Sequence, residues 1–286
     1  MTKNREQLII TNTVEVSGAV SYWRVASDTN LTTLAAAWEK YGLDAATLPK
    51  PPKDEVALGR AVNSMAEKHL LVRPLARRGA WALVRETVVE GQAPIYSTRV
   101  TVGVGEPHIA KVDATDSEHN MFIKNIDDAF QRARDTLAHH DISSWLLDIA
   151  YGKLGAISLR DSGGIYFIPR TNVAIWDKIA GALEEAGSMI FRIPAMRTAE
   201  AVAAITDAIT AEAAAMAQKI EDELLATGDA ALGKRALRTR VEESMRLLDK
   251  LSTYEELIGK QLEIRSRVEL LSANVTSLAL SEPEAA

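Results

Sequence analysis

The residues of this chain best suited to contacting a ligand are three arginines and a tryptophan within nine positions: Arg73, Arg77, Arg78 and Trp81. Guanidinium groups bind phosphates, and an exposed indole ring can stack on a base. This spacing favours nucleic-acid contact by a basic loop that leads into a strand. A structural interpretation stays open, in which Trp81 faces the core and the arginines pair with acidic residues of a neighbouring subunit.

A second motif, Asp161-Ser162-Gly163-Gly164, resembles the sequence around the nucleophile of chymotrypsin-like proteases. A nucleophilic serine also needs an oriented histidine and a carboxylate. The chain lacks the many-stranded, helix-poor pattern of a double β-barrel. A polar stretch of this kind between two apolar runs is typical of a hairpin turn, so we expect a turn and no protease activity.

The compact set of carboxylate and imidazole groups at Asp113, Asp116, Glu118 and His119 is the best candidate for a cation site. It lacks the glycine of a calcium-binding loop, and acidic residues here would also favour the positive end of a following helix. The chain has no cysteine and no P-loop. We therefore expect no metal, no cofactor and no enzymatic activity, with an enzyme of scattered site residues as the alternative.

The elements that must position these groups are short strands and helices in mixed order. Alternating apolar residues predict a strand over 14–25 and hairpins over 80–104 and 156–169. A helix precedes each hairpin, as in a winged helix. The fold class predicted is α+β, with small antiparallel sheets, covering helices and a winged-helix-like arrangement as one form of it.

Residues 198–280 contain no proline, and their apolar residues step by three or four. This pattern predicts a long antiparallel helical hairpin, or coiled-coil arm, joined at Thr227-Gly228-Asp229. Its helices would be about 45 and 75 Å long, so the residues after Ile258 would need a partner on the globular part or on another subunit. The predicted oligomerisation seam comprises Val202, Ile205, Ile209, Leu248, Leu251, Ile258, Val268, Leu271 and Val275.

These patterns divide the chain into consecutive segments with different expected structures. The first holds a strand and a helix, the next two each hold helix and hairpin, and the fourth is the helical arm. A short tail, expected to be disordered, completes the chain. The predicted boundaries are 1–48, 49–117, 118–197, 198–280 and 281–286.

The net charge of −6 argues against a dedicated duplex-DNA binder. Residues 198–286 carry 10 basic and 16 acidic side chains, which accounts for all of it. Basic side chains dominate residues 50–85 and acidic ones dominate 106–148, so copies could dock head-to-tail, although scattered solvated charge explains the pattern equally well.

The start lacks a signal peptide's apolar core, and no stretch reaches the roughly 18 apolar residues of a membrane span. We expect a cytoplasmic protein without membrane contact.

A set of short sequence blocks runs along the chain. In order they are Trp38, Gly42-Leu43-Asp44, Leu48-Pro49-Lys50-Pro51-Pro52, Leu70–Leu75, Gly79–Val84, Gly163–Pro169 and Ile193-Pro194. Together they resemble an uncharacterised bacterial and phage protein family. The resemblance covers most of the chain and implies no activity, cofactor or functional residue.

The sequence therefore predicts a non-enzymatic, self-assembling scaffold or adaptor protein. It would form a homo-oligomer, or bridge protein partners, through the helical arm. The alternative is a nucleic-acid-binding protein, either winged-helix-like or an oligomeric single-strand binder, that uses the basic loop over 73–81.

Overall fold

The computed structural model describes residues 15–91, 93–105, 110–114, 119–226 and 232–281, without the side chains of 110–114, 119–123 and 281. The chain forms two compact units, each assembled from separated segments. Unit 1 comprises Met1–Trp23, Leu147–Asp177 and Ile190–Ala286, and unit 2 comprises Arg24–Leu146 and Lys178–Met189.

Unit 1 contains a four-stranded sheet with the order β10-β1-β9-β8. Its strands are β1 (Val16–Arg24), β8 (Ile157–Ser158), β9 (Tyr166–Pro169) and β10 (Met189–Met196). Strands β8 and β9 pair antiparallel around the Asp161–Gly164 turn, where Gly163 and Gly164 have positive φ angles. This confirms the predicted hairpin turn. Strand β1 pairs antiparallel with β9, with Gly18 opposite Pro169.

The two faces of this sheet pack against different helices. On one face Trp176 of α5 (Arg170–Glu185) donates a hydrogen bond from Nε1 to Ser21 Oγ at 2.9 Å. On the other face the Phe167 ring lies 6.0 Å from the Tyr254 ring, centroid to centroid. Burying these aromatic side chains holds the sheet between α5 and the C-terminal helices.

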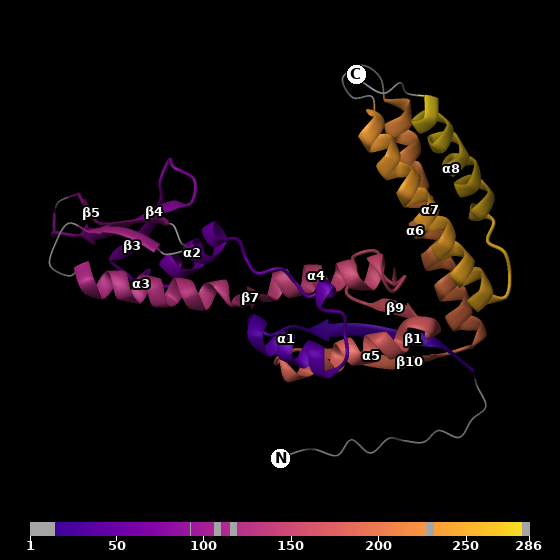
Figure 1. The fold of residues 1–286 in the computed structure, drawn as a ribbon, viewed down its shortest axis with the longest axis horizontal. Helices are drawn as coiled ribbons and strands as arrows, with labels where there is room; N and C mark the ends of the chain where they lie inside the picture. The colour runs from indigo at the N-terminus through magenta and orange to yellow at the C-terminus, as the bar shows by residue number, and fades with distance from the viewer. Residues whose placement is uncertain (1–14, 92, 106–109, 115–118, 227–231, 282–286) are drawn as a thin grey trace, which may run out of the picture. The chain divides into compact units, whose positions relative to one another are not determined.

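The C-terminal helices α6 (Ala199–Leu225), α7 (Lys234–Ile258) and α8 (Ile264–Ser281) lie side by side as a bundle (Figure 1). Thr198 caps α6, because its Oγ1 accepts a hydrogen bond from Ala201 N at 3.2 Å. The structure differs from the sequence prediction in one respect. The second long helix ends at Ile258, since Gly259 takes a left-handed conformation with φ of 81°, and α8 packs back on α6 and α7. The predicted junction at 227–229 lies outside the described residues.

Unit 2 is built on an antiparallel sheet with the order β3-β4-β5-β6. Its strands are β3 (Leu70–Pro74), β4 (Ala80–Thr87), β5 (Ile95–Val104) and β6 (Ala110–Ala114). The predicted 80–104 hairpin thus forms the middle of a larger sheet. Helices α2 (Asp54–Asn63) and α3 (His119–Arg134) pack together on one face (Figure 1). The core between them includes Leu58, Val62, Leu83, Val100, Ile126 and Phe130.

A second cluster of unit 2 surrounds two tryptophans. Here a two-stranded sheet of β2 (Asp28–Asn30) and β7 (Thr136–Ala138) accompanies α1 (Leu31–Lys40), η1 (Ala45–Thr47) and α4 (His139–Gly152). Trp38 and Trp145 pack with their ring centroids 5.2 Å apart. Each indole Nε1 donates to a backbone oxygen, of Asp44 at 3.0 Å and of Thr47 at 2.8 Å respectively. The pair thereby fixes the loop before the proline-rich stretch.

The predicted α+β class, with small antiparallel sheets and covering helices, is confirmed. No helix in the described ranges has both the length and the apolarity that a membrane crossing requires.

Candidate functional site

The register of the unit 2 sheet decides which side chains face its helices. Val72 lies opposite Leu83, and Leu83 lies opposite Val100; all three pack in the core with α2 and α3. Successive side chains on a strand point to opposite faces. The neighbouring row, formed by Arg73, Ala82 and Thr101, therefore lies on the face away from these helices.

An extra residue in β5 extends this second face toward the end of the hairpin. Leu83 pairs with Val100 but Val84 pairs with Thr98, so Arg99 forms a β-bulge. The bulge puts Thr98 on the same face as Val84, although Val100 faces the helices. We call this surface the open face, and it comprises Leu71, Arg73, Ala82, Val84, Glu86, Tyr96, Thr98 and Thr101.

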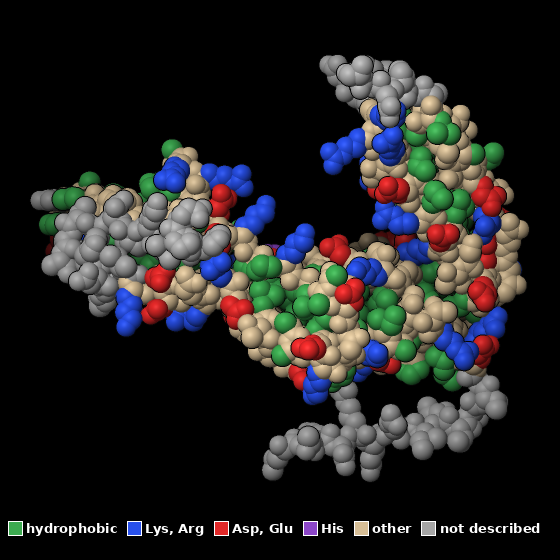
Figure 2. All heavy atoms as spheres, viewed as in Figure 1, with side chains coloured by type: hydrophobic (Ala, Val, Ile, Leu, Met, Phe, Trp, Pro, Cys, Tyr) green, Lys and Arg blue, Asp and Glu red, His purple; other side chains and the backbone are tan. Residues whose placement is uncertain are grey.

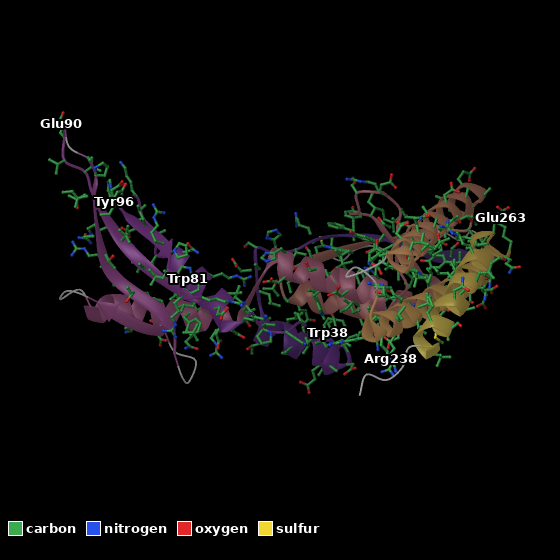
Figure 3. All side chains as sticks on the ribbon, turned by 90° about the horizontal axis from the view of Figure 1, so that it is seen from above. Trp38, Trp81, Glu90, Tyr96, Arg238 and Glu263 are labelled. Carbon is green, nitrogen blue, oxygen red and sulfur yellow. The ribbon has the colours of Figure 1, made fainter. Side chains whose placement is uncertain are left out.

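Tyr96 is the aromatic residue of the open face. Its side chain is 56% exposed and lies near the end of the hairpin, whose turn carries Glu90 (Figure 3). The Tyr96 hydroxyl donates a hydrogen bond to Glu86 Oε1 at 2.8 Å, and this bond to a carboxylate raises the pKa of Tyr96. The contact orients the ring without burying it.

The three predicted arginines lie at one end of this sheet. Arg73 is exposed on the open face, and Arg77 and Arg78 are exposed in the turn between β3 and β4. Figure 2 shows basic side chains projecting from unit 2 around this turn. Arg78 Nε donates to Glu55 Oε2 at 3.0 Å, a surface ion pair of small energetic weight. Arg73 and Arg77 form no ion pair with the described residues.

Trp81 lies on the opposite, helix-covered face. Its ring lies against α2, where a Cβ added to Gly59 would be 2.9 Å from Trp81 Cζ2. The ring packs at the edge of the core, so the structural interpretation of Trp81 is the one observed. The exposed aromatic side chain on the same face as Arg73 is Tyr96 instead, which lies toward the other end of β4. Strand alternation alone could not identify it, because the bulge at Arg99 reverses the alternation.

The oppositely charged segments of the sequence meet within unit 2. Arg60 Nη2 lies 2.6 Å from Asp141 Oδ2, and Arg134 Nε lies 2.9 Å from Asp54 Oδ1. Burial by itself would raise the pKa of Asp141, but the hydrogen bonds from Arg60 and Ala138 N outweigh it and lower the pKa. Part of the charge available for head-to-tail docking is therefore used inside the chain.

The predicted arm seam is covered by the chain's own helices. Val202 and Leu248 are half-buried, and the other seven residues are buried: Ile205, Ile209, Leu251, Ile258, Val268, Leu271 and Val275. The last three belong to α8, which packs on α6 and α7. The expected length mismatch does not arise, because α8 returns along the bundle instead of extending beyond it. Their role in oligomerisation stays a prediction.

A cavity of about 490 Å³ in unit 1 is lined by charged and aromatic side chains, among them Lys250. Lys250 Nζ donates to Ala156 O at 2.6 Å and to the Glu212 carboxylate, and it lies 5.2 Å from the Tyr151 ring centroid. Burial lowers the pKa of Lys250 despite the opposing effect of Glu212. The Lys250 ammonium and its acceptors thus satisfy one another's hydrogen bonding. These bonds connect α7 to α6 and to the residue before β8. Sequence reasoning missed this cluster because no motif joins its members.

Residues 18–284 match the model of a family described as a family of unknown function, DUF6744. The chain belongs to this family. The resemblance noted in the sequence is thus confirmed, whereas a bacterial or phage origin stays a prediction. Comparison with curated proteins and comparison with solved structures gave no match.

In this DUF6744 member, the metal candidates Asp113, Asp116, Glu118 and His119 lie outside the described side chains. Within the described part of the chain, no group of three or more His, Cys, Asp or Glu residues could hold a metal ion. The open face consequently offers arginine and tyrosine chemistry: charge-assisted hydrogen bonds and ring stacking.

Proposed function

We propose that this protein binds single-stranded nucleic acid through the open face of the unit 2 sheet. The observation that carries the proposal is the strand register, which puts exposed Tyr96 and exposed Arg73 on the sheet face opposite α2 and α3. This arrangement supports the nucleic-acid alternative but moves its stacking ring from Trp81 to Tyr96.

The open face combines the two contacts that single strands need. An exposed tyrosine ring can stack on any base, because every base has a π-face. Arg73 lies on the same face, and Arg77 continues the basic surface into the turn after β3. Both guanidinium groups are free of ion pairs with the described residues, so a phosphate would not have to displace a carboxylate from them.

A single strand fits this surface better than a duplex. In a duplex the base faces are stacked and unavailable to Tyr96, whereas a sheet with one open face can receive unstacked bases. The net charge of −6 also limits long-range attraction to a duplex. The contacts expected from Tyr96 and the two arginines carry no base-edge readout, so little sequence preference is expected.

The test is fluorescence anisotropy with a labelled oligothymidine at several salt concentrations. Tyr96→Ala should weaken binding by roughly 5- to 150-fold, the range for losing one base stack. The Arg73→Ala/Arg77→Ala double variant should reduce the salt slope by about 1.4, because about 0.7 is lost for each phosphate contact to a single strand. Tyr96→Phe keeps the ring and should bind nearly as well as the wild type.

Arg132→Ala is the matched control. Arg132 is an exposed arginine of α3, the helix that packs on the covered face, and it should leave affinity unchanged. Equal affinity of the wild type, the Tyr96→Ala variant and the double arginine variant would refute the proposal. Folding of each variant is checked by near-ultraviolet circular dichroism.

The self-assembling scaffold or adaptor is the second candidate, supported by a different observation. Val88, Val89 and Ile95 at the end of the β4–β5 hairpin are 60%, 44% and 57% exposed. Adjacent exposed apolar side chains often mark protein–protein contacts. The scaffold proposal therefore moves from the arm seam, which the bundle buries, to this hairpin end, with a second copy of the chain as the proposed partner.

A further inference from the structure

A small cavity of unit 1 is bordered by two arginines and the start of helix α5. Its volume is about 190 Å³, and its lining includes Glu15, Ser17, Arg170, Thr171, Arg197 and Glu256. Glu15 lies just before β1, Arg170 is the first residue of α5, and Arg197 follows β10. Three separate parts of unit 1 therefore converge on one point.

The two arginines hold a carboxylate of the chain itself. Glu15 Oε1 lies 3.0 Å from Arg170 Nη1, and Glu15 Oε2 lies 3.0 Å from Arg197 Nη1. The carboxylate thus bridges both guanidinium groups with its two oxygens. The Glu15 side chain is half-exposed, so it can leave the arginines without opening the core.

Ser17 adds a donor that the chain leaves unused. The residue is only 4% exposed, it lines the same cavity, and its Oγ has no hydrogen-bond partner in the described structure. Ser21, four residues later in β1, faces α5 through its bond to Trp176, so strand alternation puts Ser17 on the same side. Gly18 pairs with Pro169, the residue before α5, so Ser17 lies beside the first turn of that helix.

We infer that this cavity is a binding site for a small oxyanion, a carboxylate or a phosphate group, and that the Glu15 carboxylate occupies the position of that ligand. The external oxyanion replaces Glu15 between Arg170 and Arg197 and accepts a further hydrogen bond from Ser17. The start of α5, a 16-residue helix, adds its positive dipole end. This site lies in unit 1 and does not rest on the nucleic-acid proposal.

The charges around the cavity suit a ligand with one negative charge on its bound group. With Glu15 displaced, Arg170 and Arg197 provide two positive charges, and Glu256 in the lining provides one negative charge. A monoanion leaves this set neutral, as the Glu15 carboxylate does now. Replacing Glu256 with glutamine should accordingly strengthen binding of either oxyanion.

The test is an NMR titration of the full chain with acetate and, separately, with inorganic phosphate. Glu15→Ala should bind at least one of them about 2- to 30-fold more tightly than the wild type, because each exposed ion pair that competes is worth a factor of roughly 1.4 to 5. In the Glu15→Ala background, Arg170→Ala and Arg197→Ala should each abolish this gain, and Ser17→Ala should reduce it.

Arg160→Ala, in the β8–β9 turn of the same unit, is the matched arginine control and should leave the titration unchanged. If Glu15→Ala weakens the start of β1, Glu15→Gln removes the charge while keeping the side-chain size. Binding that is no tighter in both Glu15 variants, for both anions, would overturn the inference. Tighter binding that persists after removal of Arg170 and Arg197 would overturn it as well.

Discussion

The buried pair of Lys250 and Glu212 makes a sharp prediction, because its two partners differ in exposure. The Lys250 side chain is 12% exposed and the Glu212 side chain is 30% exposed. Removing one partner of a buried ion pair typically costs roughly 3–5 kcal/mol, since the other charge is left desolvated. Glu212→Gln leaves the enclosed ammonium and should cost about 3 kcal/mol, whereas Lys250→Met leaves a carboxylate that reaches water and should cost about 1 kcal/mol.

The pH dependence of the pair gives a second readout. Burial lowers the pKa of Lys250 in the folded protein below its ordinary value of 10.5. Between the lowered pKa and 10.5 the unfolded chain binds more protons, so this residue makes the free energy of unfolding rise with pH. Glu212 raises the pKa of Lys250. Glu212→Gln should therefore widen this window toward lower pH, and Lys250→Met should remove it.

The assay is hydrogen exchange of the α6 and α7 amides measured by mass spectrometry, which reports on unit 1 even if the two units unfold separately. The matched controls are Lys219→Met, at an exposed position of α6, and Glu263→Gln, at an exposed position just before α8. Each should change the free energy of unfolding by less than about 0.5 kcal/mol. A larger loss for Lys250→Met than for Glu212→Gln would refute the reasoning.

Two further predictions concern the end of α7 and the hairpin of unit 2. Gly259→Ala should destabilise the bundle by about 1–2 kcal/mol, the cost of left-handed backbone for alanine, and its Cβ would meet Arg197 Nη2 at 3.3 Å. Gly259→Asn should cost less, and amide exchange that is unchanged in Gly259→Ala would contradict this account. If the scaffold proposal holds, mass photometry should show an oligomer that Val88→Asp and Ile95→Asp dissociate. Val56→Asp, at an exposed position of α2, should leave it intact; a monomer at every concentration, or an oligomer unaffected by both variants, would count against a hairpin contact.

Local signals in the sequence predicted the local structure well. Thr198 caps its helix because the capping bond involves only the following three residues. The turn at Asp161–Gly164 formed because two adjacent glycines can take positive φ angles. The helical pattern of the C-terminal part is equally readable, but it does not reveal the helix end at Gly259, because Ile258 and Leu262 continue the apolar pattern on either side of it.

What the sequence could not predict depends on contacts between distant segments. Alternation places Trp81 and Ala82 on opposite faces, but only packing by Gly59 of α2 shows which face is covered. No sequence motif marks the bulge at Arg99, so strand alternation alone does not give the orientation of Tyr96. Likewise, Arg60 and Asp141 appeared as members of two charged surfaces until the fold brought them together.

The position of β1 has a consequence for how the chain folds during synthesis. This strand leaves the ribosome well before its neighbours β9 and β10 and before the indole of Trp176, which lies 155 positions after Ser21. At roughly 5–20 residues per second, the interval is on the order of 10–30 s. During that time a strand with the apolar residues of a sheet interior has no native partner, while α2, the β3–β6 sheet and α3 are already complete. During this interval the nascent chain therefore presents a β-strand without its native partners, and the free backbone groups of such a strand can pair with another chain.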